Sequence, residues 1–405
     1  MQHREWNPKS FFKKLSPAVM AAYEAEHKLA LARDASKPPH DQTYHAWVLL
    51  PEAQRLKLET ELLPVNDMCS PHARPYLEAQ ARLTWTDGDA HLIDESRDWT
   101  AHDLAMRLYL ADAAGFARAH QAYAVDMMEH FKEYRGKHPV TLRATPAAKE
   151  RMKREMTAHF REYAGGARCQ VEDFEGKDKF ALFIYHEDEM TPLDRFDDAG
   201  VVVPDWQRPV VRIAAVFYPD TFTLLVKAPR QPEREKLRDL FAEIFIGDTD
   251  YFEDTSKTPK YSFDPIRDAA FTFPTHPADG IDEVSVVRVT ARPAHAYVKR
   301  SNVELTPGLS TAGLHEALDS QGIDAGDDPI DGVRLQFQFE GKGRSRFRTV
   351  SLHNPNSTNL RDTTRDRLIR RYLKEWGFDG TKSALALAVP ALGAAPVVSA
   401  TAQPG

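Results

Sequence analysis

The spacing of hydrophobic residues divides the chain into two parts. From Pro8 to about Gly165, apolar residues recur every three or four positions with few β-branched residues among them, which is typical of amphipathic helices. After Gly166, apolar and polar residues alternate over short runs, which is typical of strands with one buried face. A run of helices followed by strands predicts an α+β protein, with an N-terminal all-helical region followed by antiparallel sheet units with covering helices.

One helix of the N-terminal part has a well-marked beginning. Thr100 is expected to be its N-cap, because a threonine side chain can accept a hydrogen bond from a backbone amide of the first turn, and Asp103 follows three residues later. The apolar spacing carries this helix on to Gly136, with a break near Gly115.

A second helix is expected to begin after Thr145, which can cap it and is followed by Pro146, and to end near Gly165. Its last residues, 159–163 (HFREY), repeat residues 130–134 (HFKEY), so the sequence predicts a repeated helix end. In both copies His and Glu lie three residues apart on one helix face, which could bind a metal. We favour a solvated, ion-paired face, and no metal is predicted.

Four strands in two hairpins are expected next, one turning near Gly176 and the other at Pro219 and Asp220. A helix from Gln231 to Gly247 then carries an apolar stripe along one side. We expect this helix to cover one face of the sheet.

The pattern also predicts the domain organisation. Residues 248–280 show no sustained period, and we expect an irregular connection there that splits the sheet part into two units. Beyond it the pattern predicts further strands, a short helix, a hairpin and a last helix. The predicted domains are a helical domain over 1–165, an antiparallel α+β domain over 166–379, and a flexible tail rich in Ala and Pro over 380–405.

Composition indicates a compartment and gives no support to several classes of enzyme. Cys69 and Cys169 lie a hundred residues apart, which supports neither a disulfide framework nor a cysteine zinc site and favours a cytoplasmic protein. The charged N-terminus does not resemble a signal peptide, and no membrane association is predicted. The chain contains no GxSxG, Walker-type, GxGxxG or HExxH motif, so catalytic residues stay unknown and no cofactor is predicted.

The charge is unevenly distributed along the chain. Residues 331–378 carry eleven Lys or Arg against five Asp or Glu, a net charge of +6 within a chain whose net charge is −7. On the expected strand, alternate positions place three arginines on one face: Arg344, Arg346 and Arg348. On the last helix, four basic residues fall opposite an apolar stripe: Arg367, Arg370, Arg371 and Lys374.

Two basic rows of this kind can follow a phosphate backbone, because the guanidinium group of Arg binds phosphate through paired hydrogen bonds. Our first hypothesis is therefore a cytoplasmic nucleic-acid-associated binding protein that uses a basic C-terminal strand and helix, and that is not an enzyme. An acidic protein surface is the alternative partner for the same residues. Charge segregation alone motivates this hypothesis.

The tetrapeptide Phe-Glu-Gly-Lys occurs at 174–177 and again at 339–342. In the second copy, Glu340 and Lys342 follow an apolar run, and Asp327 or Asp328 could supply an upstream acid; this arrangement resembles the metal-dependent PD-(D/E)xK nucleases. The resemblance implies a divalent metal held by the two acids and a lysine that stabilises charge. Our second hypothesis is therefore a metal-dependent phosphodiesterase or nuclease. The alternative interpretation of the same tetrapeptide is the turn of a hairpin.

Residues 186–198 (HEDEMTPLDRFDD) hold one imidazole and six carboxylates without the spacing of a calcium loop. We expect a solvated acidic segment there, able to bind a divalent ion or to pair with basic residues such as those of the C-terminal part. The acidic remainder of the chain and its helical front half also fit a subunit of a multiprotein assembly, which is our third hypothesis. A large exposed apolar patch in the folded protein would favour it.

Overall fold

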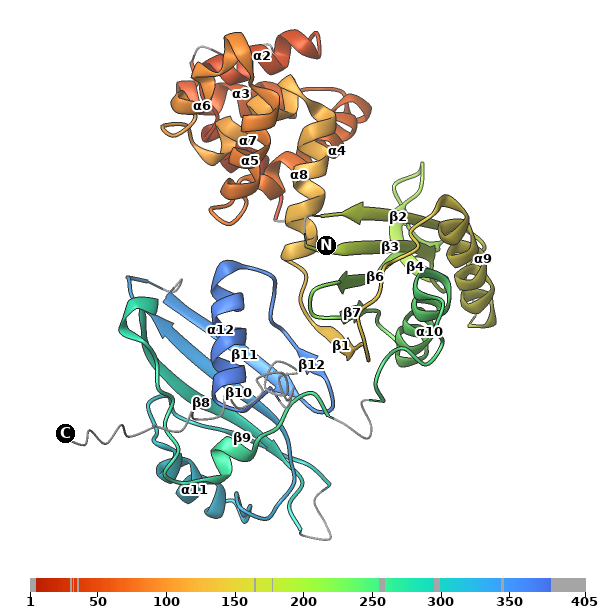
Figure 1. Cartoon of the computed structure of the whole chain (residues 1–405). Helices are drawn as coiled ribbons and strands as arrows, with labels where there is room; N and C mark the ends of the chain where they lie inside the picture. The colour runs from red at the N-terminus through yellow and green to blue at the C-terminus, as the bar shows by residue number, and fades with distance from the viewer. Residues whose placement is uncertain are drawn as a thin grey trace, which may run out of the picture. The chain divides into compact units, whose positions relative to one another are not determined.

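The computed structural model describes residues 5–379, except residues 30, 32, 35, 164, 177, 255–258, 295–298, 344 and 345 (Figure 1). These residues form two compact units. The first comprises the described residues up to Glu253 together with Leu360–Asp366, and the second comprises Asp254–Asn359 and the described residues from Arg367 on. Helices precede antiparallel strands in the first unit, and antiparallel strands with helices form the second, so the predicted α+β class is confirmed. The predicted tail, 380–405, lies outside the described residues.

The N-terminal part of the first unit is a group of helices around a core of its own. Phe11, Tyr23, Trp47 and Leu62 are almost completely buried in this core. The helices are α1 (Pro8–Lys13), α2 (Pro17–Glu26), α3 (Pro39–Val48), α4 (Glu52–Met68), α5 (Arg74–Thr84), α6 (His91–Glu95), α7 (Ala101–Ala111) and α8 (Ala113–Asp126), with a short 3-10 turn η1 (Asp87–Asp89).

Local hydrogen bonds set the boundary between α7 and α8. The Thr100 side chain accepts a hydrogen bond from the Asp103 backbone amide at 3.0 Å and caps α7, as predicted. The expected break is also present, because the Asp112 carboxylate accepts from the Gly115 amide at 2.8 Å and begins α8. Each capping oxygen satisfies a backbone donor that has no partner within its own helix.

The predicted continuation of this helix beyond Asp126 is wrong. The chain leaves α8 there, and Phe131–Arg135 form strand β1, which pairs with β7 (Thr223–Lys227). Phe131 is buried on one face of the sheet and Tyr134 on the other, so the segment lacks the alternation that marks a half-exposed strand. Its backbone partners lie far along the chain, where local spacing gives no information about them.

The sheet of the first unit is antiparallel, with the strand order β2-β3-β6-β7-β1. The two predicted hairpins are confirmed: β2 (Cys169–Glu175) pairs with β3 (Phe180–Glu187), and β6 (Val210–Tyr218) pairs with β7. The central pair is β3 with β6, in which Phe183 lies opposite Ala214.

Helices α9 (Pro146–Glu162) and α10 (Gln231–Phe241) lie on one face of this sheet (Figure 1). Thr145 caps α9 as predicted, accepting from the Ala148 amide at 3.2 Å. A π-helical segment, η2 (Ala242–Ile246), continues α10 up to Gly247, whose φ of 87° is a conformation that favours glycine. Both predicted helices are thus confirmed. Because HFREY belongs to α9 whereas HFKEY lies mainly in β1, the predicted repeat of a helix end is wrong.

The end of α8 packs against the other face of the same sheet. Val125 of α8 and Met128 just after it pack on the sheet face opposite α9. Their neighbours there include Ala181, Phe183 and Val216. Burial on both faces explains why β3 reads as a nearly continuous apolar run.

The second unit has the strand order β12-β11-β10-β8-β9, with every pair antiparallel. Trp376 stacks on Phe337 of β10 at 5.9 Å between ring centroids, so the last helix packs on this sheet. The irregular segment predicted over 248–280 is confirmed in its described part, which holds the short 3-10 turns η3 (Asp264–Arg267) and η4 (Pro277–Asp279). The remaining elements are β8 (Ile281–Ala291), β9 (Ser301–Glu304), α11 (Thr311–Asp319), β10 (Ile330–Phe339), β11 (Phe347–His353), β12 (Ser357–Thr358) and α12 (Thr364–Glu375).

A further hairpin connects β3 to β6 and was not predicted. Strands β4 (Thr191–Phe196) and β5 (Val202–Gln207) form a separate two-stranded sheet, with Thr191 opposite Gln207. The main sheet pairs Glu187 with Val210 just before this hairpin begins. We call residues 191–207 the arm. The acidic segment predicted over 186–198 is therefore the end of β3 followed by the first strand of the arm.

Candidate functional site

The last helix has the two-sided character that the sequence predicts. Its apolar residues Ile369, Tyr372, Leu373 and Trp376 are buried. Of the four predicted site residues on this helix, three are exposed: Arg367, Arg371 and Lys374. The fourth, Arg370, is half-buried. The helix therefore presents cationic side chains on the side opposite its buried stripe.

Arg371 already has acidic neighbours. Its guanidinium pairs with Asp279 and, at 3.5 Å, with Glu375 on the next turn of α12. Tyr372 also donates a hydrogen bond to Asp279. This hydrogen bond and, to a lesser extent, the charge of Arg371 lower the pKa of the Asp279 carboxyl, which keeps the carboxylate ionised beside the helix. A ligand phosphate would have to compete with Asp279 for Arg371.

The three predicted strand arginines do not share one environment. Arg344 lies outside the described residues. Arg346 precedes β11, and its guanidinium lies 4.6 Å from the ring centroid of the exposed Phe347. Arg348 is half-buried and donates to the Asn359 carbonyl at 2.7 Å. The half-buried Arg346 thus forms a cation–π pair with the exposed Phe347, whereas Arg348 is engaged by the backbone of its own chain.

The Arg346–Phe347 pair and the C-terminal half of α12 lie at the same end of the second unit's sheet. Phe337, on which Trp376 stacks, is the register partner of Arg348 at the start of β11. At the same end of β10, the Glu340 amide donates to the Gly280 carbonyl at 2.9 Å, next to the Asp279 that pairs with α12. We define the basic surface as the half-buried Arg346 and the exposed Phe347 at this end of the sheet, together with the exposed Arg367, Arg371 and Lys374 along α12.

The residues of the nuclease hypothesis do not converge. Glu340 and Lys342 are exposed just after β10, whereas Asp328 precedes β10 at its other end, roughly 30 Å away at the rise of a ten-residue strand. Asp328 is buried and accepts backbone hydrogen bonds from Asp324 and Ala294, both at 2.9 Å. Asp327 is exposed beside it. Lys177 of the first tetrapeptide lies outside the described residues. In the part of the chain that the structure describes, no three His, Cys, Asp or Glu side chains are grouped to hold a metal ion.

The arm carries a surface that sequence reasoning missed. Phe196, Val202 and Trp206 are 70%, 56% and 59% exposed. The register pairs Phe196 with Val202 and Pro192 with Trp206, so these side chains share one face of the arm. The sequence signal was an apolar run, Val201 to Val203, followed by Trp206. It was not interpreted as a strand because it shows no alternation and lies between the two expected hairpins.

The other face of the arm is more polar. Leu193 and Asp205 are register partners there, and Arg195 pairs with Asp205 at 3.5 Å. At the tip, the Asp197 amide donates to the Val201 carbonyl at 2.9 Å, and Gly200 has a φ of 77°. The apolar residues therefore concentrate on a single face of a closed hairpin.

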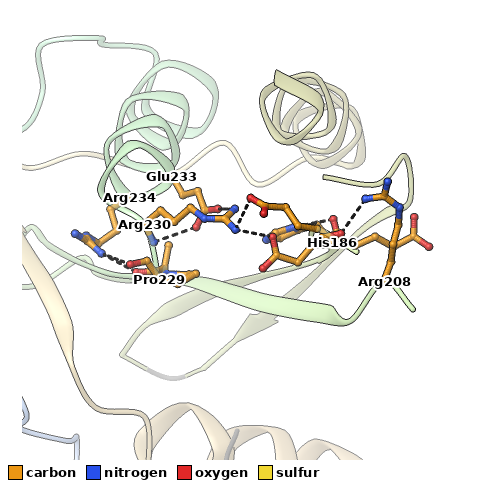
Figure 2. A network of polar contacts seen from close by, with 10 residues as sticks. His186, Arg208, Pro229, Arg230, Glu233 and Arg234 are labelled. Carbon is orange, nitrogen blue, oxygen red and sulfur yellow. Dashed lines mark hydrogen bonds and ion pairs between the residues drawn. The ribbon is translucent and has the colours of Figure 1, made fainter. Parts of the chain in front are cut away.

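Arg230 anchors the base of the arm (Figure 2). Its guanidinium binds Asp188 at 2.9 Å, Glu233 at 3.1 Å and Glu189 at 3.2 Å, joining the start of α10 to the segment between β3 and β4. Desolvation of Arg230 is opposed by its hydrogen bond and ion pair with Asp188, and the net effect raises the pKa of the guanidinium. Arg208 adds a hydrogen bond to the Asp188 carbonyl at 3.0 Å. The acidic segment thus has its basic partner in the first unit.

Two buried histidines lie beside this base. The His186 ring stacks on Phe160 of α9, with centroids 3.6 Å apart and planes 12° apart. His159, also on α9, is buried, and burial lowers the pKa of its imidazole. The Nε2 atoms of both imidazoles lack a hydrogen-bond partner among the described residues. Both imidazoles therefore serve as packing groups against Phe160.

No protein-family model matches this sequence, and a search of curated proteins finds no match to it either. Across the described ranges of the chain, none of the helices has both the length and the apolar character that crossing a membrane requires.

Proposed function

We propose that this protein binds nucleic acid through the basic surface of its second unit. The observation that carries the proposal is the exposed Phe347 ring with the Arg346 guanidinium against it, at the sheet end where α12 presents Arg371 and Lys374. Bases stack on exposed aromatic rings and on guanidinium planes, while cations contact the phosphates between them. This combination favours a single strand, whose bases are free to stack.

An acidic protein surface would use the same cations without using the ring. Phe347 therefore distinguishes the two partners, since stacking contributes to binding of a base but not of a carboxylate. The protein would act in a reducing, cytoplasmic setting, in keeping with the free thiols of Cys69 and Cys169.

The test is the anisotropy of a fluorescent single-stranded oligonucleotide, titrated with the full-length protein at several salt concentrations. Charge reversal of Arg367 and Lys374 to Glu is expected to weaken binding of every oligonucleotide sequence and to reduce the slope of log K against log salt by about 0.7 for each lost phosphate contact. The matched control reverses Arg97 and Arg154, which are 77% and 70% exposed in the first unit. The control variant is expected to bind like the unmodified protein.

A second arm of the experiment uses Phe347→Ala with the oligonucleotide and with poly-glutamate as an acidic competitor. The substitution is expected to weaken oligonucleotide binding by roughly 1–3 kcal/mol and to leave poly-glutamate binding unchanged. Equal affinity of the unmodified protein for both polymers would point to an acidic protein partner instead. No binding of the oligonucleotide at low salt would rule out the proposal.

A further inference from the structure

The arm exposes a contiguous apolar face that its own fold does not require. Phe196, Val202 and Trp206 lie on the same face of two paired strands, and each is more than half exposed. On the same face, Pro192 lies opposite Trp206 and Pro204 lies opposite Asp194. Scattered exposed apolar residues are ordinary, but aromatic and aliphatic residues gathered on one face of a projecting element mark a contact surface.

The arm is held in place before any partner arrives. A two-stranded hairpin is only marginally stable in isolation. Here the pairing of β3 with β6 leads directly into it, and Arg230 fixes its base through Asp188 and Glu189. A surface held in this way loses little conformational entropy when it docks.

The charge of the arm identifies what it can dock against. Residues 191–207 contain four carboxylates and a single guanidinium, that of Arg195, which is already paired with Asp205. Asp194 lies on the apolar face itself, and Asp197 and Asp198 are at the tip. Two copies packed through this face would bring like charges together, which is costly at a desolvated interface. Anionic lipid surfaces would repel the arm for the same reason.

We infer that the arm docks into a partner protein whose surface has an apolar groove bordered by Lys and Arg. Phe196 and Trp206 are the anchors that fill the groove, and Asp194, Asp197 and Asp198 meet the basic border. This contact concerns the first unit alone and is independent of the nucleic-acid proposal, which rests on the second unit.

The test is selection from a random peptide library displayed on phage, with the full-length protein immobilised. The expected result is enrichment of peptides that combine aromatic or aliphatic residues with flanking Lys or Arg. Synthetic copies of the enriched peptides are expected to bind at least tenfold more weakly to the double variant Phe196→Ser, Trp206→Ser, because buried aromatic anchors dominate interface energy. Their binding is expected to weaken as salt increases.

The matched control is Leu193→Ser, which removes a 52% exposed side chain from the opposite face of the same strand. This variant is expected to bind the peptides like the unmodified protein. Both Ser variants are expected to keep the thermal unfolding midpoint, because none of the three side chains packs in a core. The Arg367→Glu, Lys374→Glu variant is also expected to keep full peptide binding, which separates this inference from the nucleic-acid proposal.

Several outcomes would overturn the inference. An apolar, basic partner at this face would be excluded if acidic peptides were enriched or if no peptides were enriched. It would also be excluded if the enriched peptides bound the double variant equally well. A dimer in sedimentation that the double variant abolishes would assign the face to a second copy. Binding to anionic vesicles that depends on Trp206 would assign it to a membrane surface.

Discussion

Single residues show how far local chemistry could be predicted. The N-caps Thr100 and Thr145 were predictable because each bonds to an amide three residues away. The neighbours of Arg348 were not predictable, since its acceptor at Asn359 is brought near by strand pairing and by the turn after β11. The same limit applies to Arg371, whose carboxylate partner at Asp279 lies in an irregular segment.

His159 gives a prediction for acidic pH. Burial, reinforced by the neighbouring charges of Lys236 and His186 and opposed by those of Glu162 and Glu233, lowers the pKa of its imidazole in the folded state. The unfolded chain therefore binds a proton first as pH falls. The stability that neutral His159 contributes is complete above its unfolded pKa of about 6.5 and is lost as pH falls toward the folded pKa.

The unfolding midpoint is accordingly expected to drop between neutral pH and about pH 5.5, and to drop less in His159→Gln. Thermal unfolding followed by circular dichroism at the two pH values measures this difference. The matched control is His91→Gln, which changes an exposed histidine and should keep the full drop. An equal drop in His159→Gln and in the unmodified protein would contradict the prediction.

At the scale of elements, the sequence predicted helices and hairpins whose apolar residues recur at a regular spacing. It missed strands that form only by pairing with distant parts of the chain. HFKEY and HFREY are nearly the same string, yet the first lies mainly in β1 and the second in α9. β1 exists because β7 supplies its hydrogen bonds. The arm was missed for the opposite reason: its strands bury little, so their apolar residues follow no core-facing pattern that a single sequence would show.

The anchoring role of Arg230 leads to a prediction about the arm. Arg230→Ala removes ion pairs to Asp188, Glu189 and Glu233, so the arm is expected to open more often. Because partly exposed ion pairs contribute about 1 kcal/mol or less, backbone amides of residues 191–207 should exchange roughly two- to fivefold faster.

Hydrogen exchange with mass spectrometry measures this opening peptide by peptide. Exchange in α9 is expected to stay unchanged, and Arg154→Ala, which alters a 70% exposed arginine on α9, serves as the control. Unchanged exchange in the arm of Arg230→Ala would show that strand pairing alone holds it.

At the scale of the whole molecule, the sequence predicted the α+β class and the uneven charge but not how the chain returns to its first unit. Leu360–Asp366 belongs to that unit although more than a hundred residues separate it from Glu253. Lys179 is buried there between Asp126 and Asp362, the latter at 2.7 Å, and Tyr218 donates to Asp362 at 2.9 Å. Burial opposes the charge on Lys179, but the two carboxylates prevail and raise the pKa of its ammonium group. No local pattern links residues so far apart.

The returning segment predicts how a fragment will behave. A chain that ends at Glu253 lacks Asp362, so Lys179 keeps only one carboxylate, and it lacks Arg361, which pairs with Glu129. Removing one partner of a buried ion pair typically lowers the free energy of unfolding by about 3–5 kcal/mol. Because Asp126 still compensates part of the charge of Lys179, we expect a loss near the lower end of this range.

Urea unfolding of the fragment, compared with the same fragment joined to residues 360–366 by a Gly-Ser linker, measures this contribution. The linked segment is expected to restore the lost free energy of unfolding. The same segment carrying Asp362→Ala is the control and should restore much less. Equal stability of all three proteins would contradict the structural role assigned to Asp362.

The return of residues 360–366 also bears on the order of events during synthesis. A ribosome completes residues 1–253 long before it reaches Asp362, and domains generally begin to fold as they emerge. Until then the buried ammonium group of Lys179 keeps the carboxylate of Asp126 but lacks that of Asp362. The first unit therefore reaches its final form only after residues 254–359 have also been made, and translation of this part of the second unit sets the time at which the first is complete.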